Sequence, residues 1–280
     1  MDLQAIRSQV DRCYRERRTD QAEQILNAAY HQAREEGDEQ ARIAVCNEME
    51  GLYRLMGQKQ RCLAAAQEAL DCLRACGMED TVPYATTLLN YATACVQFGQ
   101  AEEGLEHYAA VERIFRTAIP ANDYRFASLY NNVGQAYMSL GRPSEAARGL
   151  EQSLEILKTM QGREMEIAIS HTNAAFASLA AAELERAERH IRQAEAAFDA
   201  IGYRGVNYDA LLAAKGQLLC RQGDDRAAAA CYAALLESTE RTYGRNQTWR
   251  NTVRNLAVIW RRAGDEEKAA YYAALLDDAD

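Results

Sequence analysis

The chain has 280 residues and is acidic, with 41 Asp and Glu side chains against 32 Lys and Arg and a formal net charge of −9. Because contacts to phosphate need clustered Lys and Arg, this balance argues against a general nucleic-acid binder. The N-terminal sequence MDLQAIRSQVDRC lacks the apolar run of a secretory signal, and no segment approaches the roughly 18 apolar residues of a membrane span. We therefore expect a cytoplasmic protein with neither a nucleic-acid nor a membrane partner.

A small residue recurs at a nearly fixed interval along the chain. It occupies six positions that lie 41 or 42 residues apart: Gly57, Gly99, Gly141, Ala182, Gly223 and Gly264. An asparagine precedes four of them by nine residues: Asn90, Asn132, Asn173 and Asn255. A fixed period in this range is typical of proteins built from stacked repeats, and it favours binding over catalysis.

In chain order, each interval predicts a helix, a short turn at the small residue, a second helix and a further break. The further breaks fall halfway between the small residues, at Gly37, residues 78–83, Pro120, Gly162, Gly202 and Gly244. Helix starts are indicated by Asp224 and Asp265, which follow turn glycines, and by Pro143 at a first-turn position. Thr19 and Asp20 give the same signal in the first interval, which lacks the glycine.

We expect seven repeats and fourteen helices in one domain spanning residues 1–280, because a stack of repeats grows without starting a second core. The expected repeats cover residues 3–37, 38–79, 80–121, 122–162, 163–203, 204–244 and 245–280. No strand pattern interrupts them, so the expected fold class is all-α.

The fourth repeat carries the clearest family pattern. Large and small residues alternate there at characteristic offsets: Tyr130, Val133, Gly134, Tyr137, Gly141, Ala146 and Leu150. This pattern resembles the tetratricopeptide repeat, which implies a right-handed α-solenoid of helix hairpins. The period exceeds the usual ~34 residues of that family by about one helical turn per helix. This length, together with the phrases at 89–92 and 130–134, is similar to the repeats of kinesin light chain and its bacterial relatives.

Two residues depart from this pattern. Glu50 occupies a slot for a small residue, and Lys215 occupies an apolar slot. We therefore expect irregular packing in the second and sixth repeats.

One face of the first helix in each repeat is predicted to carry polar side chains, opposite the apolar stripe. In tetratricopeptide proteins the first helices line the concave surface, so the resemblance implies that these faces form a groove. The candidate groove residues are Asn90, Asn131, Asn132, Asn173, Asn255, Gln97, Gln135, Gln217 and Phe176.

Asparagine is a mediocre helix former, so its repetition in the middle of helices is not explained by stability. Its amide both donates and accepts hydrogen bonds, and it can pair with the backbone of an extended peptide. In relatives of this fold, asparagines at this offset hold a peptide backbone, which implies that role for Asn90, Asn132 and Asn173. The alternative is a structural ladder, in which the asparagines bond to one another or to neighbouring helices.

Arginines gather near the C-terminal end of the expected groove. Residues 241–262 contain six arginines and no acidic side chain. With Arg221, Arg254 and Arg262 facing the groove, this surplus predicts a site for an acidic peptide segment. The alternative is a solvated face paired with acids of adjacent helices, such as Glu237, Glu266 and Glu267.

The remaining reactive side chains do not form a recognisable motif. Most of the eight cysteines fall on apolar helix positions, which predicts buried free thiols, and no Cys-x-x-Cys occurs. The four histidines, His31, His107, His171 and His190, are scattered. There is no phosphate loop, nucleophile elbow or metal motif in the sequence. We therefore expect no enzyme, no cofactor and no metal.

The leading functional prediction is a scaffold that holds an extended peptide or partner segment in its groove. One alternative is a peptide-responsive regulatory sensor that acts through a partner. Another is a structural protein that self-associates as a homodimer through its last helix, where Tyr271, Tyr272, Leu275 and Leu276 lack an obvious cover. The sequence does not identify the ligand.

Overall fold

The computed structural model describes residues 1–16 and 18–277, and within them it contains fourteen helices and no strand. The helices are α1 (Leu3–Arg15), α2 (Thr19–Glu36), α3 (Glu39–Leu55), α4 (Lys59–Ala75), α5 (Val82–Gln97), α6 (Ala101–Ala118), α7 (Tyr124–Ser139), α8 (Pro143–Leu157), α9 (Glu164–Ala180), α10 (Leu184–Ala200), α11 (Val206–Gln222), α12 (Asp225–Tyr243), α13 (Gln247–Arg262) and α14 (Glu266–Asp277). Each expected repeat contains one pair of these helices. The predictions of an all-α fold and of fourteen helices are confirmed.

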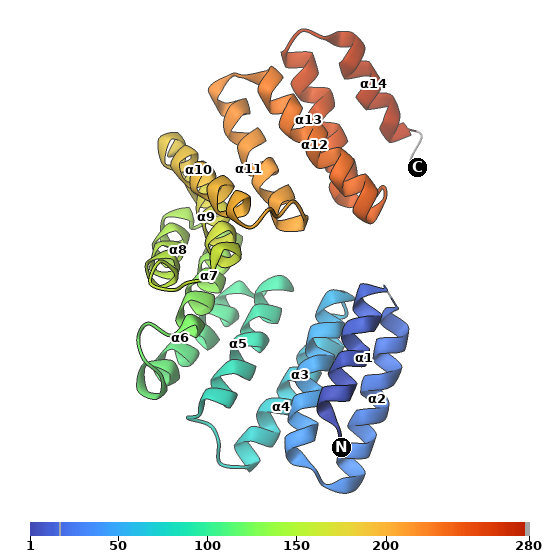
Figure 1. Cartoon of the computed structure of the whole chain (residues 1–280), viewed down its shortest axis with the longest axis vertical. Coiled ribbons are helices and arrows are strands. Elements are labelled where there is room, and N and C mark those ends of the chain that lie inside the picture. Colours follow the sequence, from blue (N-terminus) through green and yellow to red (C-terminus); the bar gives the residue numbers. More distant parts are fainter. Residues whose placement is uncertain (17, 278–280) are drawn as a thin grey trace. The chain divides into compact units, whose positions relative to one another are not determined.

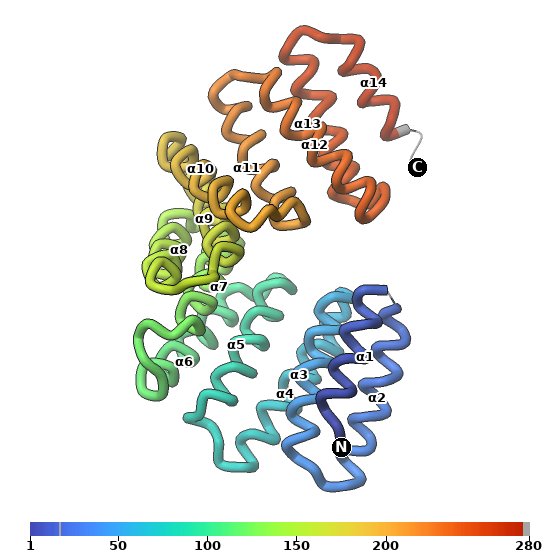
Figure 2. The backbone as a smooth tube through the Cα atoms, in the orientation of Figure 1, coloured from blue at the N-terminus to red at the C-terminus, as the bar shows by residue number. Residues whose placement is uncertain are grey.

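The chain divides into two compact units, Met1–Gly141 with helices α1 to α7 and Arg142–Asp280 with helices α8 to α14. Within each unit, successive helices pack side by side and are joined by short turns (Figures 1 and 2). First helices of neighbouring repeats also touch, as α3 does with α1 and α5, and as α9 does with α11. These contacts are those of an α-solenoid, in which each repeat packs on its neighbours.

The turns inside the repeats lie at the predicted small residues. Each of these six residues has a positive φ, between 60° at Ala182 and 82° at Gly99 and Gly223. After five of them, the N–H of the next residue donates to a carbonyl five residues earlier, as from Gln100 to Cys95 at 2.8 Å. The left-handed turn residue and this hydrogen bond between residues five apart end the helix. The hydrogen bond also satisfies one of the last carbonyls of the helix.

The predicted helix starts are also confirmed. The carboxylate of Asp224 accepts from the N–H of Ala227 at 3.1 Å, and that of Asp265 accepts from the N–H of Lys268 at 3.0 Å. Pro143 is the first residue of α8, where its missing N–H costs nothing. Local sequence therefore determines the start and the end of these helices.

The core of each unit fills with alanine, leucine and aromatic side chains. The small slots are buried as predicted, with Ala92 and Ala175 on first helices and Ala146, Ala187 and Ala228 on second helices all fully covered. Small side chains at these points let the two helices of a hairpin approach closely.

The two departures from the pattern are accommodated by ion pairs. Glu50 is only 1% exposed, and its carboxylate lies 3.2 Å from Nε of Arg54. Burial raises the pKa of Glu50, and Arg54 opposes that rise. Lys215 donates to the carboxylate of Glu195 at 2.6 Å, which raises the pKa of Lys215.

The eight cysteines are all free thiols, and five of them are buried. Burial raises the pKa of Cys46 and of Cys62 to about 12, so these thiols are inert. Among the described residues, no helix has both the length and the apolar character needed to cross a membrane.

Candidate functional site

The polar faces of the first helices are accessible to solvent, as the sequence predicts. In the first unit, Asn90 and Asn132 are half-buried, and Gln97 and Gln135 are exposed. In the second unit, Gln217 is half-buried and Asn255, Arg221, Arg254 and Arg262 are exposed. Phe176 is half-buried and packs against the core formed by α9, α10 and α11.

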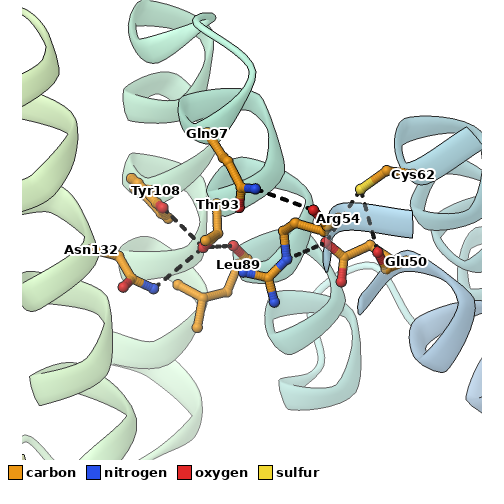
Figure 3. Close-up of polar contacts among 8 residues, drawn as sticks. All are labelled: Glu50, Arg54, Cys62, Leu89, Thr93, Gln97, Tyr108 and Asn132. Carbon is orange, nitrogen blue, oxygen red and sulfur yellow. Dashed lines mark hydrogen bonds and ion pairs between the residues drawn. The ribbon is translucent and has the colours of Figure 1, made fainter. Parts of the chain in front are cut away.

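Asn132 takes part in a polar network inside the first unit (Figure 3). Its Nδ2 donates to Oγ1 of Thr93 at 3.3 Å, which links α7 to α5. The hydroxyl of Thr93 donates in turn to the carbonyl of Leu89 at 2.8 Å and lies 3.0 Å from the hydroxyl of Tyr108. This network favours the structural ladder as the role of Asn132.

A similar bond joins the preceding pair of first helices. Nδ2 of Asn47 on α3 donates to Oγ1 of Thr87 on α5 at 3.2 Å. The pairing of Asn with Thr therefore occurs twice between first helices of neighbouring repeats. Asn47 lies ten residues before Gly57, whereas the asparagines of the predicted row lie nine residues before their turn residues, so Asn47 was not predicted as a member of this set.

Gln97 and Arg262 make equivalent contacts in different units. Each lies two residues before its turn residue and donates to a carbonyl of the preceding first helix: Gln97 to Arg54 at 3.2 Å, and Arg262 to Cys220 at 3.0 Å. Figure 3 shows the first of these contacts beside the Glu50–Arg54 pair. These two side chains tie neighbouring repeats together by satisfying carbonyls at a helix end.

Asn90 differs from the other asparagines. Within the described part of the chain its side chain makes no hydrogen bond, although it lies in the middle of α5 and is half-buried. Asn131 and Asn173, by contrast, each have an interaction partner. The half-buried amide of Asn90 is therefore available to water or to a ligand.

Three of the six arginines in residues 241–262 form ion pairs: Arg245, Arg261 and Arg262. Nη2 of Arg262 lies 2.9 Å from Asp225, and Nε of Arg245 lies 3.1 Å from Glu240. Arg254 is exposed and donates to Asn251 at 3.2 Å. Arg221 is exposed and forms no ion pair among the described residues. The alternative of a solvated, paired face therefore describes Arg245 and Arg262, while Arg221 and Arg254 carry charge without an acidic partner.

Two pockets of the first unit lie away from the predicted groove residues. A pocket of about 450 Å³ is lined by α4, α5 and α6, with Arg74, Tyr91 and His107 among its residues. A second, of about 370 Å³, is lined by α2, α3 and α4, with Tyr30 and Glu68 among its residues. Both lie between second helices of successive repeats, a position for which the sequence pattern gave no signal.

Two histidines that the sequence analysis treated as scattered meet in the second unit. Nδ1 of His171 on α9 lies 3.0 Å from Nδ1 of His190 on α10, and both rings are largely buried. Burial and the neighbouring imidazole lower the pKa of His171 to about 4, and burial lowers that of His190. The two histidines are 19 residues apart and lie on either side of a turn, so no short sequence motif contains both.

Comparisons with known proteins identify the fold. No protein-family model matches the chain, and no curated protein sequence matches it. Solved structures do match. The apo form of RapI has 14% identity and a TM-score of 0.70, covering 100% of this chain and 97% of that one. A tetratricopeptide repeat protein from Parabacteroides merdae has 16% identity and a TM-score of 0.62, covering 99% and 92%.

A third match is a Rap protein complexed with competence and sporulation factor, with 16% identity and a TM-score of 0.59, covering 96% of this chain and 72% of that one. At these identities the likeness concerns the fold. The chain therefore has the fold of tetratricopeptide-like repeat proteins, as the repeat pattern predicted.

Proposed function

We propose that the chain is a repeat scaffold that binds an extended peptide or a segment of a partner protein along the first helices of its repeats. The proposal assigns no catalytic reaction to the chain. Asn90, Asn131, Asn132, Asn173, Gln97, Gln135, Gln217, Phe176 and Asn255 remain the candidate contact residues.

The observation that carries the proposal is the unpartnered amide of Asn90. Its side chain lies on the accessible face of α5 and makes no hydrogen bond within the described residues. The amide side chain has an NH2 group that can donate to a peptide C=O and an oxygen that can accept from a peptide N–H. Asn132 is a less direct test of the proposal than Asn90. It already donates to Thr93, so its loss would also disturb packing between the helices.

The fold supports binding of this kind. The Rap protein that shares the fold is complexed with competence and sporulation factor. By analogy, a second candidate function is a regulatory sensor, in which a bound segment changes how the chain engages a further partner. Both functions need the same contact at Asn90.

The unpaired charge supports an acidic ligand at the C-terminal end. Arg221 and Arg254 are exposed and lack an acidic partner within the described chain. Exposed guanidinium groups of this kind bind carboxylates through charge-assisted hydrogen bonds. The eight free thiols support a reducing compartment such as the cytoplasm.

A display library of random linear peptides tests the proposal. The expected result is a set of selected peptides that bind the purified chain and that bind the Asn90→Ala variant about twofold to tenfold more weakly, as one lost hydrogen bond predicts. The variant should be as stable as the wild type, or more stable by up to about 0.7 kcal/mol, because alanine is the better helix former.

Asn27→Ala is the matched control. Asn27 is also half-buried in the middle of a helix and also makes no side-chain hydrogen bond among the described residues, but it lies on the second helix α2. Its loss should leave peptide affinity unchanged. Equal binding by the Asn90→Ala variant and the wild type would place the peptide site elsewhere, and a library without binders would refute the scaffold proposal for linear peptides.

A further inference from the structure

Three metal-ligating side chains converge between α5 and α6 in the first unit. The Sγ of Cys95, a carboxylate oxygen of Glu103 and an imidazole nitrogen of His107 all lie within 4.8 Å of one another. Nε2 of His107 lies 3.8 Å from Oε1 of Glu103, one helical turn away on α6. The cluster contains one donor of each type that zinc binds in proteins.

The close approach of the two helices at Gly104 makes this convergence possible. A Cβ atom at position 104 would lie 2.5 Å from a methyl carbon of Val96 and 3.0 Å from the carbonyl oxygen of Ala92. A residue larger than glycine would therefore require Val96 or the two helices to shift. The cluster members Cys95 and Glu103 flank this contact, since each is adjacent in sequence to one of its residues.

Neighbouring side chains already orient two of the three donors. Nε2 of Gln100 donates to Oε2 of Glu103 at 2.6 Å, which leaves Oε1 on the side of His107. The ring of Tyr91 lies edge-on to the imidazole of His107, with 5.1 Å between the ring centroids. Such outer contacts are a regular feature of metal sites, where they fix the orientation of the ligands.

The positions of Cys95 and Glu103 hold an aromatic residue and a cation in two other repeats. In the second repeat, Tyr53 lies four residues before the turn residue and Arg61 lies four residues after it. The guanidinium of Arg61 lies 4.1 Å from the centroid of the Tyr53 ring. The seventh repeat places Lys268 over the ring of Trp260 at 3.9 Å. The third repeat has a thiol and a carboxylate at these two positions, and both groups are metal donors.

We propose that Cys95, Glu103 and His107 bind one Zn²⁺ ion in a tetrahedral site with its fourth position open to water. Zinc bonds of about 2.0 to 2.3 Å place neighbouring donors about 3.3 to 3.8 Å apart, so rotation of the half-buried Glu103 and His107 side chains closes the site. Glu103 and His107 also line the pocket of about 450 Å³ between α4, α5 and α6, which provides an entry path and room for the fourth ligand. Cys95 shares α5 with the proposed peptide contacts Asn90 and Gln97, but neither of these is a ligand of the site.

Zinc displaces the thiol proton on binding. Burial raises the pKa of Cys95 to about 11, while Tyr91 and Lys59 oppose that rise. The bound form therefore carries one thiolate, one carboxylate and one neutral imidazole against the two charges of the metal. Uptake of zinc should release about one proton per chain near neutral pH.

Titration with cobalt and zinc tests the site on the full chain after removal of metal by a chelator. The expected result is one equivalent of Co²⁺ bound with a thiolate-to-cobalt charge-transfer band, which one equivalent of Zn²⁺ then abolishes. Loss of an outer contact alone costs 10- to 100-fold in metal affinity, so Cys95→Ala and His107→Gln should each weaken binding by at least about 100-fold. Cys95→Ala should also remove the band.

Two matched controls separate this site from other thiols and imidazoles. Cys46→Ala changes another buried helical thiol, and His190→Gln changes the histidine at the same repeat position as His107. Both should keep one equivalent of tight metal with the band. Far-UV circular dichroism in metal-free buffer shows whether each variant folds. If Cys95→Ala, which changes a buried residue, does not fold, then His107→Gln, which changes a half-buried residue, provides the test. Failure of the wild type to bind Zn²⁺ at micromolar concentration, or an unchanged band in Cys95→Ala, overturns the proposal.

Discussion

Ala182 is the one turn residue of its set that is not glycine. Its φ of 60° matches the five glycines at the equivalent positions, so the repeat geometry forces an alanine into the left-handed region. Left-handed backbone costs a residue with a Cβ roughly 1 to 2 kcal/mol, which glycine avoids. A change from alanine to glycine would remove this cost. Part of the resulting stabilisation would be lost, because glycine has more conformational freedom in the unfolded chain.

We therefore predict that Ala182→Gly stabilises the protein by about 0.5 to 1 kcal/mol. Urea denaturation followed by circular dichroism measures the shift of the midpoint. The reverse change, Gly223→Ala, should cost about 1 kcal/mol, since φ is 82° there and a Cβ would meet nothing within 4 Å. Ala181→Gly is the control, because Ala181 has a φ of −79°. A lower midpoint for Ala182→Gly would contradict the strain argument.

Residue patterns predict the turns and helix starts because both depend on local backbone chemistry. Asp224 and Asp265 cap the helices that follow them, and the turn residues adopt the expected conformation. The partners of Asn132 and Gln97 were not predictable, since Thr93 and the carbonyl of Arg54 belong to neighbouring repeats. The asparagine row was visible in the sequence, but its division into partnered and unpartnered amides depends on packing between helices.

At the scale of the helix hairpin, the buried His171–His190 pair makes the second unit sensitive to acid. A separation of 3.0 Å between the two Nδ1 atoms requires that one nitrogen carry a proton and the other lack it. Lys158, Arg186 and Arg189 add positive charge nearby, and Glu151 opposes them. Further protonation is therefore unfavourable in the folded state.

We predict that this pair destabilises the protein as the pH falls. In the unfolded chain His171 takes up a proton near pH 6.5, whereas in the folded chain it does so near pH 4. The stability that neutral His171 contributes is present above pH 6.5 and is lost as the pH falls to 4. The loss between pH 7 and pH 5 should be about 2 kcal/mol.

Urea denaturation of the wild type and of a His171→Gln, His190→Gln double variant at pH 7 and pH 5 measures this effect. The double variant should lose about 2 kcal/mol less than the wild type over that interval. Comparison with the variant matters because Glu50 and Asp209 have raised pKa values and act in the opposite direction. His31→Gln, which changes an exposed histidine, should behave as the wild type does. Identical pH dependence of the double variant and the wild type would refute the prediction.

At the scale of the whole molecule, we propose that the seven repeats form one domain. The fourth predicted repeat, residues 122–162, is divided between the two compact units, because α7 ends the first and α8 begins the second. Sequence period alone predicts uninterrupted repeats and gives no sign of this division.

We also predict that the apolar face of α14 forms a homodimer. Tyr271 is 60% exposed, and Tyr272, Leu275 and Leu276 are half-buried beside it. Multi-angle light scattering should show the mass rising toward that of a dimer as concentration increases, and Tyr271→Lys should restore the monomer mass. Leu55→Lys changes a residue that is 66% exposed on α3 and should leave the mass unchanged. A monomer mass for the wild type at every concentration would eliminate the dimer.

The left-handed turn at every forty-first or forty-second residue also limits how such a gene can change in length. Recombination that removes or duplicates one whole period joins a second helix to the same kind of first helix that followed it before, and every remaining turn keeps its residue. A deletion of any other length places a turn residue inside a helix or leaves a helix without its stop. The length of this protein can therefore change in steps of one repeat with little structural cost.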